Sequence, residues 1–321
     1  MRYKSLNKII VILGPTSSGK SDIAIKLAKK FNGEVISADS RQIYRGMDVG
    51  TGKVRGTWNV ERGTFVSEKI PHYMIDIIYP RTSFNAAKYK KQAEKIIDDI
   101  LKRGKLPIIC GGTGFWIQTI VDDVNFPEVK PDWQLRKKLE KRSAEKLFAM
   151  LKKLDLRRAK TIDKNNKVRL VRAIEICKSI GKVPKIPAYA KASAGKQNTK
   201  YQIPDTKYRT LQIGLKLSKE QLYSNIEKRV LSRFKQGMIA EVEKLRRQGL
   251  SWKKIQSFGL AYFWIPLYLQ NKIAKKELIE KVTQAEKNYA KRQMTWFKRD
   301  KRIKWLKNHS EIEKAVKLSL K

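Results

Sequence analysis

The chain has 321 residues, enough for one large domain or two moderate ones, and its 72 Lys and Arg against 30 Asp and Glu give a formal net charge of +42. A charge this high predicts a polyanionic partner such as a nucleic acid, although a lysine-rich proteome would account for part of it. The two cysteines, Cys110 and Cys177, predict reduced, buried thiols and exclude a disulfide framework, and the lack of any apolar run near the roughly 20 residues of a membrane span predicts a cytoplasmic protein with no membrane contact.

The first predicted elements surround a glycine-rich loop. A short apolar strand over residues 9–13 leads into GPTSSGKS (14–21), and residues 21–31 carry apolar side chains at helical spacing. A strand, a glycine loop and a helix in this order are typical of a phosphate-binding loop, in which backbone N–H groups and the helix N-terminus bind phosphate oxygens. Lys20 adds a positive charge there, and Ser21 can reach a Mg²⁺ ion.

Strands and helices then alternate. We expect strands over residues 34–37, 72–78 and 107–110, and a helix over about 85–103 that is capped by Thr82 or Ser83. This alternation predicts an α/β fold with a parallel sheet flanked by helices on both faces.

Two polar residues follow strands of this sheet and therefore lie at the edge where open α/β sheets bind ligands. Asp39 comes just after the strand over residues 34–37, and Thr113 stands in the turn Gly-Gly-Thr-Gly (111–114). Asp39 could instead be a turn or helix-capping residue, and the glycine turn could be a simple turn. Asp39 and Asp76 are both candidates for a carboxylate that supports Mg²⁺, with a structural role favoured for Asp76.

The pattern changes after about residue 122. Residues 132–181 are almost wholly helical in pattern, and residues 184–204 hold three prolines and few large aliphatic side chains, which predicts a mobile connection. A strand over 208–217 returns the chain to the first sheet, and the pattern from residue 219 to the end is helical. We therefore predict a core domain of residues 1–122 and 207–321, with a helical insertion domain and linker over residues 123–206.

Six segments occur in order between residues 9 and 298: GPTSSGKS (14–21), ISADSRQIYRGMDVGTGK (36–53), PHYMID (71–76), GGTGFWIQ (111–118), KVRLVRAIE (167–175) and YAKRQMTWF (289–297). Together they resemble the tRNA dimethylallyltransferases, which prenylate N6 of adenine 37 beside the anticodon. The resemblance implies a P-loop NTPase-like fold with an inserted helical domain. It also implies a Mg²⁺-assisted monomeric enzyme whose substrates are dimethylallyl diphosphate and tRNAs that read codons beginning with U.

The resemblance also assigns roles to residues. It implies that the glycine loop binds the diphosphate of the prenyl donor through Gly14, Thr16, Ser17, Ser18, Gly19, Lys20 and Ser21, together with Arg229, and that Ser21 contacts the metal. Asp39 matches the general base that accepts the proton of the adenine amine. Thr113 matches the threonine that hydrogen-bonds the bridging oxygen of the leaving group. The matched tRNA-binding positions are Asp39, Ser40, Arg41, Gln42, Arg169, Arg172, Gly259, Lys291, Arg292 and Gln293.

Two positions depart from the family pattern: Leu260 replaces a tyrosine after a glycine, and Lys287 replaces an arginine. For Trp296 and Phe297 we favour packing in the core over contact with RNA.

Three other functions stay open. The first is prenylation of free AMP, ADP or ATP, although so small an acceptor would not need a basic inserted domain. The second is a kinase or NTPase that binds ATP in the loop and acts on RNA or a metabolite. The third is an RNA-binding protein with a degenerate loop, which the intact Lys20, Ser21, Asp39 and Thr113 disfavour.

Overall fold

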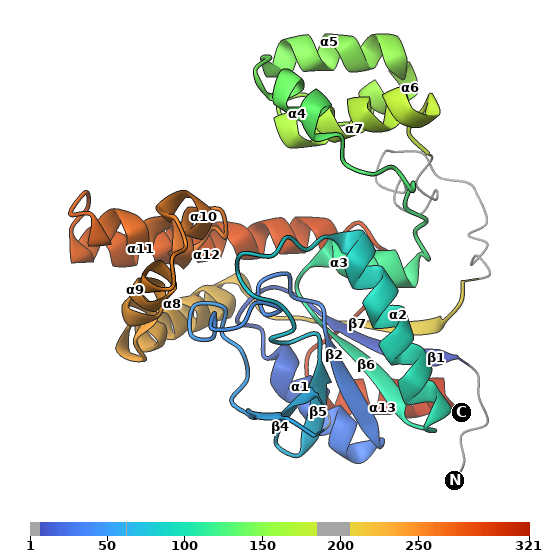
Figure 1. Cartoon of the computed structure of the whole chain (residues 1–321). Helices are drawn as coiled ribbons and strands as arrows, with labels where there is room; N and C mark the ends of the chain where they lie inside the picture. Colours follow the sequence, from blue (N-terminus) through green and yellow to red (C-terminus); the bar gives the residue numbers. More distant parts are fainter. Residues whose placement is uncertain (1–6, 62, 185–205) are drawn as a thin grey trace. The chain divides into compact units, whose positions relative to one another are not determined.

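The computed structural model of the chain describes residues 7–61, 63–184 and 206–321 (Figure 1). The chain divides into two compact units, Met1–Asp123 with Ala192–Lys321 and Val124–Lys191. The connection predicted over residues 184–204 lies outside the described residues, apart from Pro184.

The described part of the larger unit is built on an eight-stranded sheet. In spatial order its strands are β3 (Thr57–Asn59), β4 (Thr64–Ser67), β5 (Ile70–Tyr73), β2 (Gly33–Ser37), β6 (Leu106–Gly111), β1 (Lys8–Leu13), β7 (Arg209–Leu215) and β8 (Lys304–Leu306). Strands from β5 to β8 pair in parallel, which confirms the predicted α/β sheet, whereas β4 pairs antiparallel with both β3 and β5. The antiparallel strands β3 and β4 extend this parallel sheet at one edge.

Helices cover both faces of the sheet (Figure 1). Ile10 and Ile12 of β1 face a core that includes α1 (Lys20–Lys30) and α13 (His309–Leu320). The alternate residues Ile9 and Val11 face a second core, because successive side chains of a strand point to opposite faces. That second core contains α2 (Ala86–Lys102), α3 (Gly114–Val121), α8 (Lys219–Lys235), α9 (Met238–Arg247), α10 (Trp252–Gln256), α11 (Ala261–Leu269) and α12 (Lys275–Phe297).

Several predicted elements need correction. Strand β5 ends at Tyr73, before the predicted end at residue 78, because Met74 and Asp76 have positive φ angles of 61° and 54°. The cap of α2 is Asn85 and not Thr82 or Ser83, since its side chain accepts a hydrogen bond from the backbone N–H of Lys88. The strands β3, β4 and β8 were not predicted.

The smaller unit contains only helices among its described residues, namely α4 (Trp133–Glu140), α5 (Ala144–Leu154), α6 (Leu156–Ala159) and α7 (Lys167–Ile180). Leu147, Leu151 and Ile174 lie in its apolar core. Glu175 is 2% exposed, and Arg136 and Arg172 both donate hydrogen bonds to its carboxylate. Burial alone would raise the pKa of Glu175, but these bonds lower it to about 2.

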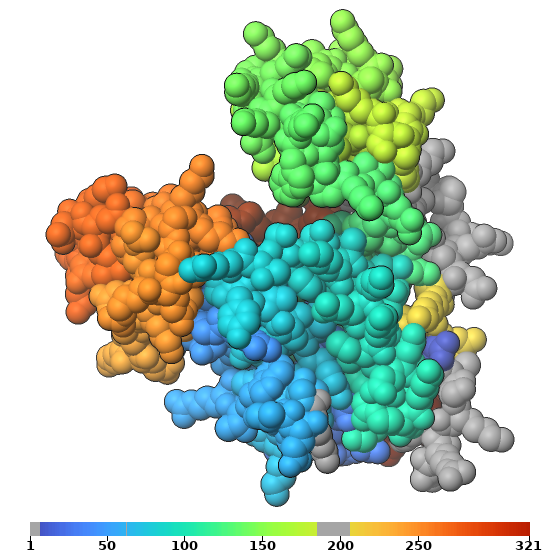
Figure 2. All heavy atoms as spheres, in the orientation of Figure 1, coloured from blue at the N-terminus to red at the C-terminus, as the bar shows by residue number. Residues whose placement is uncertain are grey.

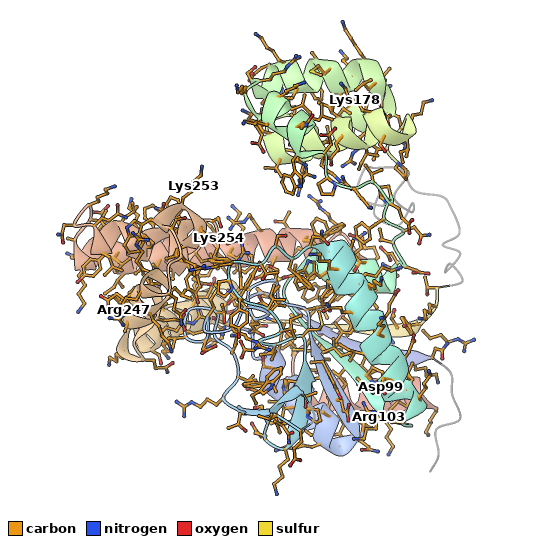
Figure 3. The ribbon with its side chains drawn as sticks, in the orientation of Figure 1. Asp99, Arg103, Lys178, Arg247, Lys253 and Lys254 are labelled. Atoms are coloured by element: carbon orange, nitrogen blue, oxygen red, sulfur yellow. The ribbon has the colours of Figure 1, made fainter. Side chains whose placement is uncertain are left out.

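Some of the surplus positive charge is held in ion pairs. At the end of α2, Arg103 contacts Asp99 at 2.9 Å and the buried Glu34 at 2.6 Å (Figure 3). In contrast, the exposed Lys178 of α7 and Lys253 of α10 extend from the surfaces of their units (Figure 3). Such exposed cations are available to a polyanion.

Two further expectations concern thiols and membranes. Cys110 and Cys177 are free and buried, as predicted. Within the described residues, no helix combines the length and the apolar character that a membrane crossing requires.

Candidate active site

The glycine-rich loop connects β1 to α1 at the carboxyl edge of the sheet. Its backbone has positive φ angles at Gly14 (150°), Ser17 (61°) and Gly19 (84°), and Gly19 immediately precedes the first residue of α1. The N-terminus of α1 thus points its free N–H groups into the loop, as an anion site requires. Ser18 is buried, and its hydroxyl has no hydrogen-bond partner among the described residues.

Lys20 is the first residue of α1 and is partly buried beside the loop. Its ammonium donates a hydrogen bond of 2.5 Å to the carbonyl oxygen of Pro15. Burial lowers the pKa of Lys20 to about 8, with the neighbouring Arg229 adding to the shift. A cation destabilised in this way would be stabilised by a bound anion.

Arg229 on α8 reaches the same loop from the opposite direction. Its guanidinium donates to the hydroxyl of Thr16 at 3.3 Å and to the carbonyl oxygen of Gly52 at 3.1 Å. Burial and the nearby Arg233 lower the pKa of Arg229 to about 10, so it stays charged at neutral pH. The two cations Lys20 and Arg229 therefore both lie at the glycine loop, and their roles in binding phosphate stay a prediction.

Asp39 and Thr113 lie close together at the ends of β2 and β6. The carboxylate of Asp39 accepts a hydrogen bond from the backbone N–H of Arg41 at 2.9 Å. The hydroxyl of Thr113 accepts one from the backbone N–H of Ser40 at 3.0 Å, and its own N–H donates to the carbonyl of Ala38. The sheet thus places a carboxylate beside a hydroxyl at the edge where the glycine loop begins.

A single pocket of the larger unit brings most of these groups together. It is lined by Thr16, Lys20, Ser21, Asp39, Ser40, Arg41, Gln42, Arg229, Gly259, Arg292 and Gln293 from the predicted set, and also by Cys110, Arg233, Phe258, Leu260, Tyr262, Glu286 and Tyr289. Arg233 and Glu286 form an ion pair of 3.0 Å in which both side chains are almost fully buried. The lining includes a carboxylate that can accept a proton, cations that can bind an anion, and aromatic side chains.

Residues 289–297 of α12 lie in three different environments. Arg292 is exposed and lines the pocket, with its guanidinium 5.8 Å from the ring centre of Tyr289. Lys291 lines a different hollow, behind the loop and next to Pro15. Phe297 is buried in the core and Trp296 packs against it, as predicted.

Gln293 is only 5% exposed, and its side-chain amide bonds to two backbone segments of the site. Its oxygen accepts from the N–H of Thr16 at 2.8 Å, and its nitrogen donates to the carbonyl of Gly112 at 2.9 Å. A side chain on Gly112 would start 2.1 Å from that nitrogen, so the glycine is required for this contact. Gln293, which the family resemblance assigns to tRNA, thus ties the phosphate loop to the turn that carries Thr113.

Aromatic and basic side chains form part of the pocket lining. Arg41 and Lys254 lie over the ring of Phe258, at 5.8 and 5.2 Å from its centre. Such a combination suits a single-stranded nucleic acid, which presents phosphates and flat bases together. Gly259 and Leu260 follow with φ angles of 75° and 50°, so Leu260 occupies a strained conformation at the position where the family has a tyrosine.

The two remaining predicted tRNA residues lie on α7 of the smaller unit. Arg169 is exposed, whereas Arg172 bonds to Glu175 and to the carbonyl of Val129. Lys287, which replaces a family arginine, forms an ion pair of 2.6 Å with Glu227 in the larger unit.

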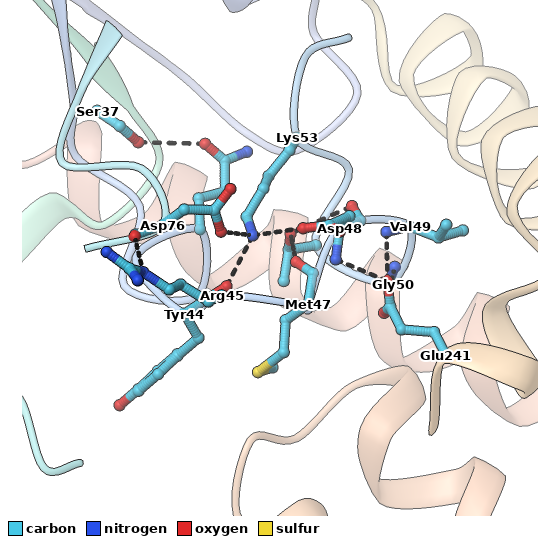
Figure 4. Close-up of polar contacts among 12 residues, drawn as sticks. Ser37, Tyr44, Arg45, Met47, Asp48, Val49, Gly50, Lys53, Asp76 and Glu241 are labelled. Carbon is cyan, nitrogen blue, oxygen red and sulfur yellow. Dashed lines mark hydrogen bonds and ion pairs between the residues drawn. The ribbon is translucent and has the colours of Figure 1, made fainter. Parts of the chain in front are cut away.

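Several residues near the site were not predicted from the sequence. They include Glu241, which contacts the loop over residues 48–53 (Figure 4). Asp76 pairs with Lys53, which agrees with the structural role favoured for it. Burial raises the pKa of the Asp76 carboxyl, and the charge of Lys53 opposes that effect.

The pocket has few protein side chains that could bind a metal ion. Within the described ranges, no group of three or more His, Cys, Asp or Glu side chains could hold an ion. Ser21, whose hydroxyl lies in hydrogen-bonding reach of the Cys110 thiol, is a hard oxygen donor that lines the pocket. This donor set fits a Mg²⁺ ion that keeps several waters and is bound mainly by phosphate oxygens of a ligand.

Comparison with known proteins gives a consistent result. Residues 42–300 match the family model described as "IPP transferase", and residues 7–62 match one described as "Isopentenyl transferase". A relative from Acetivibrio thermocellus named tRNA dimethylallyltransferase is 38% identical, over 98% of this chain and 95% of its own. Another of the same name, from a Thermoanaerobacter species, is 40% identical, over 96% of each chain.

Two solved structures also match over nearly the whole chain. A tRNA delta(2)-isopentenylpyrophosphate transferase from Staphylococcus epidermidis is 37% identical, covers 98% of this chain and 99% of its own, and gives a TM-score of 0.67. A tRNA isopentenylpyrophosphate transferase from Bacillus halodurans is 30% identical, covers 98% and 97%, and gives 0.68.

Proposed function

The chain belongs to the IPP transferase family, whose members prenylate tRNA, and on that premise we propose that it transfers a dimethylallyl group from dimethylallyl diphosphate to N6 of adenine 37. The acceptor lies in the anticodon loop of tRNAs that read codons beginning with U. The observation that carries this proposal is the single pocket that holds a carboxylate, Asp39, together with the phosphate loop and Arg229.

The phosphate loop would bind the leaving group. As the allylic C1–O bond breaks, its electron pair moves to the diphosphate, whose negative charge grows. Lys20, Arg229 and the N–H groups of the loop interact with that charge more strongly in the transition state than in the ground state, and this difference accelerates the reaction. Mg²⁺ bound with the diphosphate would neutralise further charge, and Ser21 is the residue that would contact it.

Asp39 would act as the general base. The lone pair of the adenine amine forms the new N6–C1 bond, and the Asp39 carboxylate accepts the proton that N6 loses. Thr113 would donate a hydrogen bond to the bridging oxygen, because the N–H of Ser40 bonds to the hydroxyl oxygen and the hydroxyl proton, now in reach of Tyr289, would turn to the ligand. The products are N6-dimethylallyl adenine and diphosphate.

The tRNA would be bound by charge and by stacking. An anticodon loop can turn out one base at low cost, so adenine 37 can enter the pocket beside Asp39. Ser40, Arg41, Gln42, Gly259 and Arg292 line that pocket and would contact the flanking nucleotides, while Arg169 and Arg172 would contact the tRNA from the helical insertion. We further propose that the enzyme acts as a monomer in the cytoplasm, where tRNA is modified.

The proposal is tested by incubating the protein with Mg²⁺, labelled dimethylallyl diphosphate and unmodified tRNA transcripts, with AMP and ATP as parallel acceptors. Mass spectrometry of digested RNA should place the label on adenine 37 and nowhere else. Label on free nucleotide would favour the adenylate prenyltransferase alternative. A folded protein that binds tRNA, transfers no label and hydrolyses ATP would favour the kinase or NTPase alternative.

A further inference from the structure

Loop 48–53 (Asp48 to Lys53) passes beside the pocket and is held at both ends (Figure 4). At its end, the side chain of Lys53 is 3% exposed, and its ammonium bonds to the carboxylates of Asp48 and Asp76 and to the carbonyl of Tyr44. From within the loop, the hydroxyl of Thr51 donates at 2.6 Å to the carbonyl of Met47, the residue just before the loop begins. The path of the loop is therefore fixed by side chains and does not rest on backbone turns alone.

Glu241, on α9, anchors the middle of this loop. Its carboxylate accepts hydrogen bonds from three successive N–H groups, those of Asp48 at 2.6 Å, Val49 at 2.7 Å and Gly50 at 3.1 Å. The hydroxyl of Tyr262 donates a fourth bond of 2.6 Å to the same carboxylate. Bonds from N–H groups to a carboxylate are charge-assisted and stronger than bonds between neutral groups.

The loop presents one backbone group to the site. The carbonyl oxygen of Gly52 accepts from the guanidinium of Arg229 at 3.1 Å and from the side-chain amide of Gln42 at 3.4 Å. Arg229 makes its other hydrogen bond to Thr16 of the phosphate loop. Gly52 thus sets the position from which Arg229 reaches the diphosphate cradle.

We propose that Glu241 is a positioning residue for the prenyl transfer, because it fixes loop 48–53 so that the Gly52 carbonyl orients Arg229 toward the diphosphate. The proposal rests on the proposed function, since it gives Arg229 the diphosphate as its ligand. Glu241 itself touches the loop and Tyr262, and its effect on the diphosphate passes through the loop to Arg229. In Figure 2, atoms of the segment from α9 to α12 (orange) lie against atoms of the N-terminal residues (blue and cyan) within the larger unit. The contact of Glu241 with loop 48–53 is therefore part of a broader packed surface.

The test uses inorganic diphosphate as the probe, measured by calorimetry in the presence of Mg²⁺ and without tRNA or prenyl donor. We expect Glu241→Ala to raise the Kd for diphosphate about tenfold, which corresponds to one charge-assisted hydrogen bond of Arg229, and to change the Kd for tRNA by less than about twofold. Glu243→Gln on the same helix removes one negative charge without touching the loop contacts and serves as the matched control. If Glu241→Ala fails to fold, Glu241→Gln replaces it, because the amide keeps one acceptor and loses the charge.

A double-mutant cycle separates positioning from general support of the fold. In an Arg229→Ala background, Glu241→Ala should change the Kd for diphosphate by less than about twofold, because the residue through which Glu241 acts is gone. Equal effects of Glu241→Ala with and without Arg229, or an unchanged Kd in the single variant, would overturn the proposal. If the protein without substitutions transfers no prenyl group to tRNA, the proposed function is refuted instead. The two failures are therefore distinguishable.

Discussion

Gly52→Ala tests whether the position of Arg229 controls use of the prenyl donor. Gly52 has a φ of 62°, and a Cβ atom there would start 2.0 Å from one guanidinium nitrogen of Arg229 and 2.3 Å from one of Arg233. Neither guanidinium can stay where it is. Because both lie at the far ends of flexible side chains, they move away, and Arg229 leaves its bonds to Gly52 and Thr16.

The size of the effect follows from the bonds that are lost. A hydrogen bond of a charged group contributes about 1.5–3 kcal/mol, which predicts a fall of about 10- to 150-fold in kcat/KM for dimethylallyl diphosphate. An alanine in the left-handed region also costs stability, by about 1 kcal/mol, whatever its neighbours. Displacement of Arg233 from its buried ion pair with Glu286 adds to this loss of stability, so the fall in kcat/KM is measured on the folded variant.

Gly46→Ala supplies the matched control. Gly46 has a φ of 73°, and a Cβ there would meet nothing within 4 Å. It should carry a similar backbone strain and leave kcat/KM within about twofold, because no guanidinium is displaced. Steady-state kinetics at saturating tRNA and thermal unfolding of both variants decide the matter. Equal kinetics of Gly52→Ala and Gly46→Ala would refute the reasoning.

Three further predictions concern the same pocket. Burial holds the pKa of Lys20 at about 8, so its charge is present below that pH and lost above it. The KM for dimethylallyl diphosphate should therefore rise as the pH passes through 8. A flat profile of KM between pH 7 and 9 would contradict this. Gln293→Ala should raise the KM for dimethylallyl diphosphate about tenfold and leave the Kd for tRNA within about twofold. Arg292→Gln should instead weaken tRNA binding. The reverse pattern in binding assays would show that Gln293 contacts tRNA. Asp39→Asn should lower kcat by about 10²- to 10⁴-fold with tRNA affinity retained, and a kcat near that of the unmodified protein would remove Asp39 as the base.

Local sequence patterns predicted the parts of the site that local structure determines. The glycine loop, Asp39 and Thr113 all follow strands with clear apolar patterns, and parallel strands bring their carboxyl ends to one edge. Strands of three residues, such as β3 (Thr57–Asn59) and β8 (Lys304–Leu306), are too short to show an alternating pattern. These strands form because a neighbouring strand offers hydrogen bonds, and no window of sequence contains that information.

Contacts between segments far apart in the chain could not be predicted from local sequence patterns. Glu241 lies more than 190 residues from the N–H groups that it accepts, and its helix carries no motif that marks the contact. Gln293 did leave a signal. Val282, Glu286, Ala290 and Phe297 share its buried face at spacings of three and four, and polar residues inside an apolar stripe indicate buried hydrogen bonds. That helical phase predicts an interior role for Gln293 in spite of its basic neighbours.

The charge inside the pocket explains why an anionic leaving group suits this site better than a neutral one. Lys20 and Arg229 are both partly buried, and desolvation lowers the pKa of both, so the free enzyme holds them in an unfavourable environment. The nearby ion pair of Arg233 with Glu286 is balanced and does not relieve them. A bound diphosphate would stabilise both cations. This stabilisation would grow as the C1–O bond breaks and more negative charge reaches the diphosphate oxygens. The same arrangement that destabilises the empty pocket therefore favours the transition state over the bound substrate, which is what a site for cleavage of an allylic diphosphate needs.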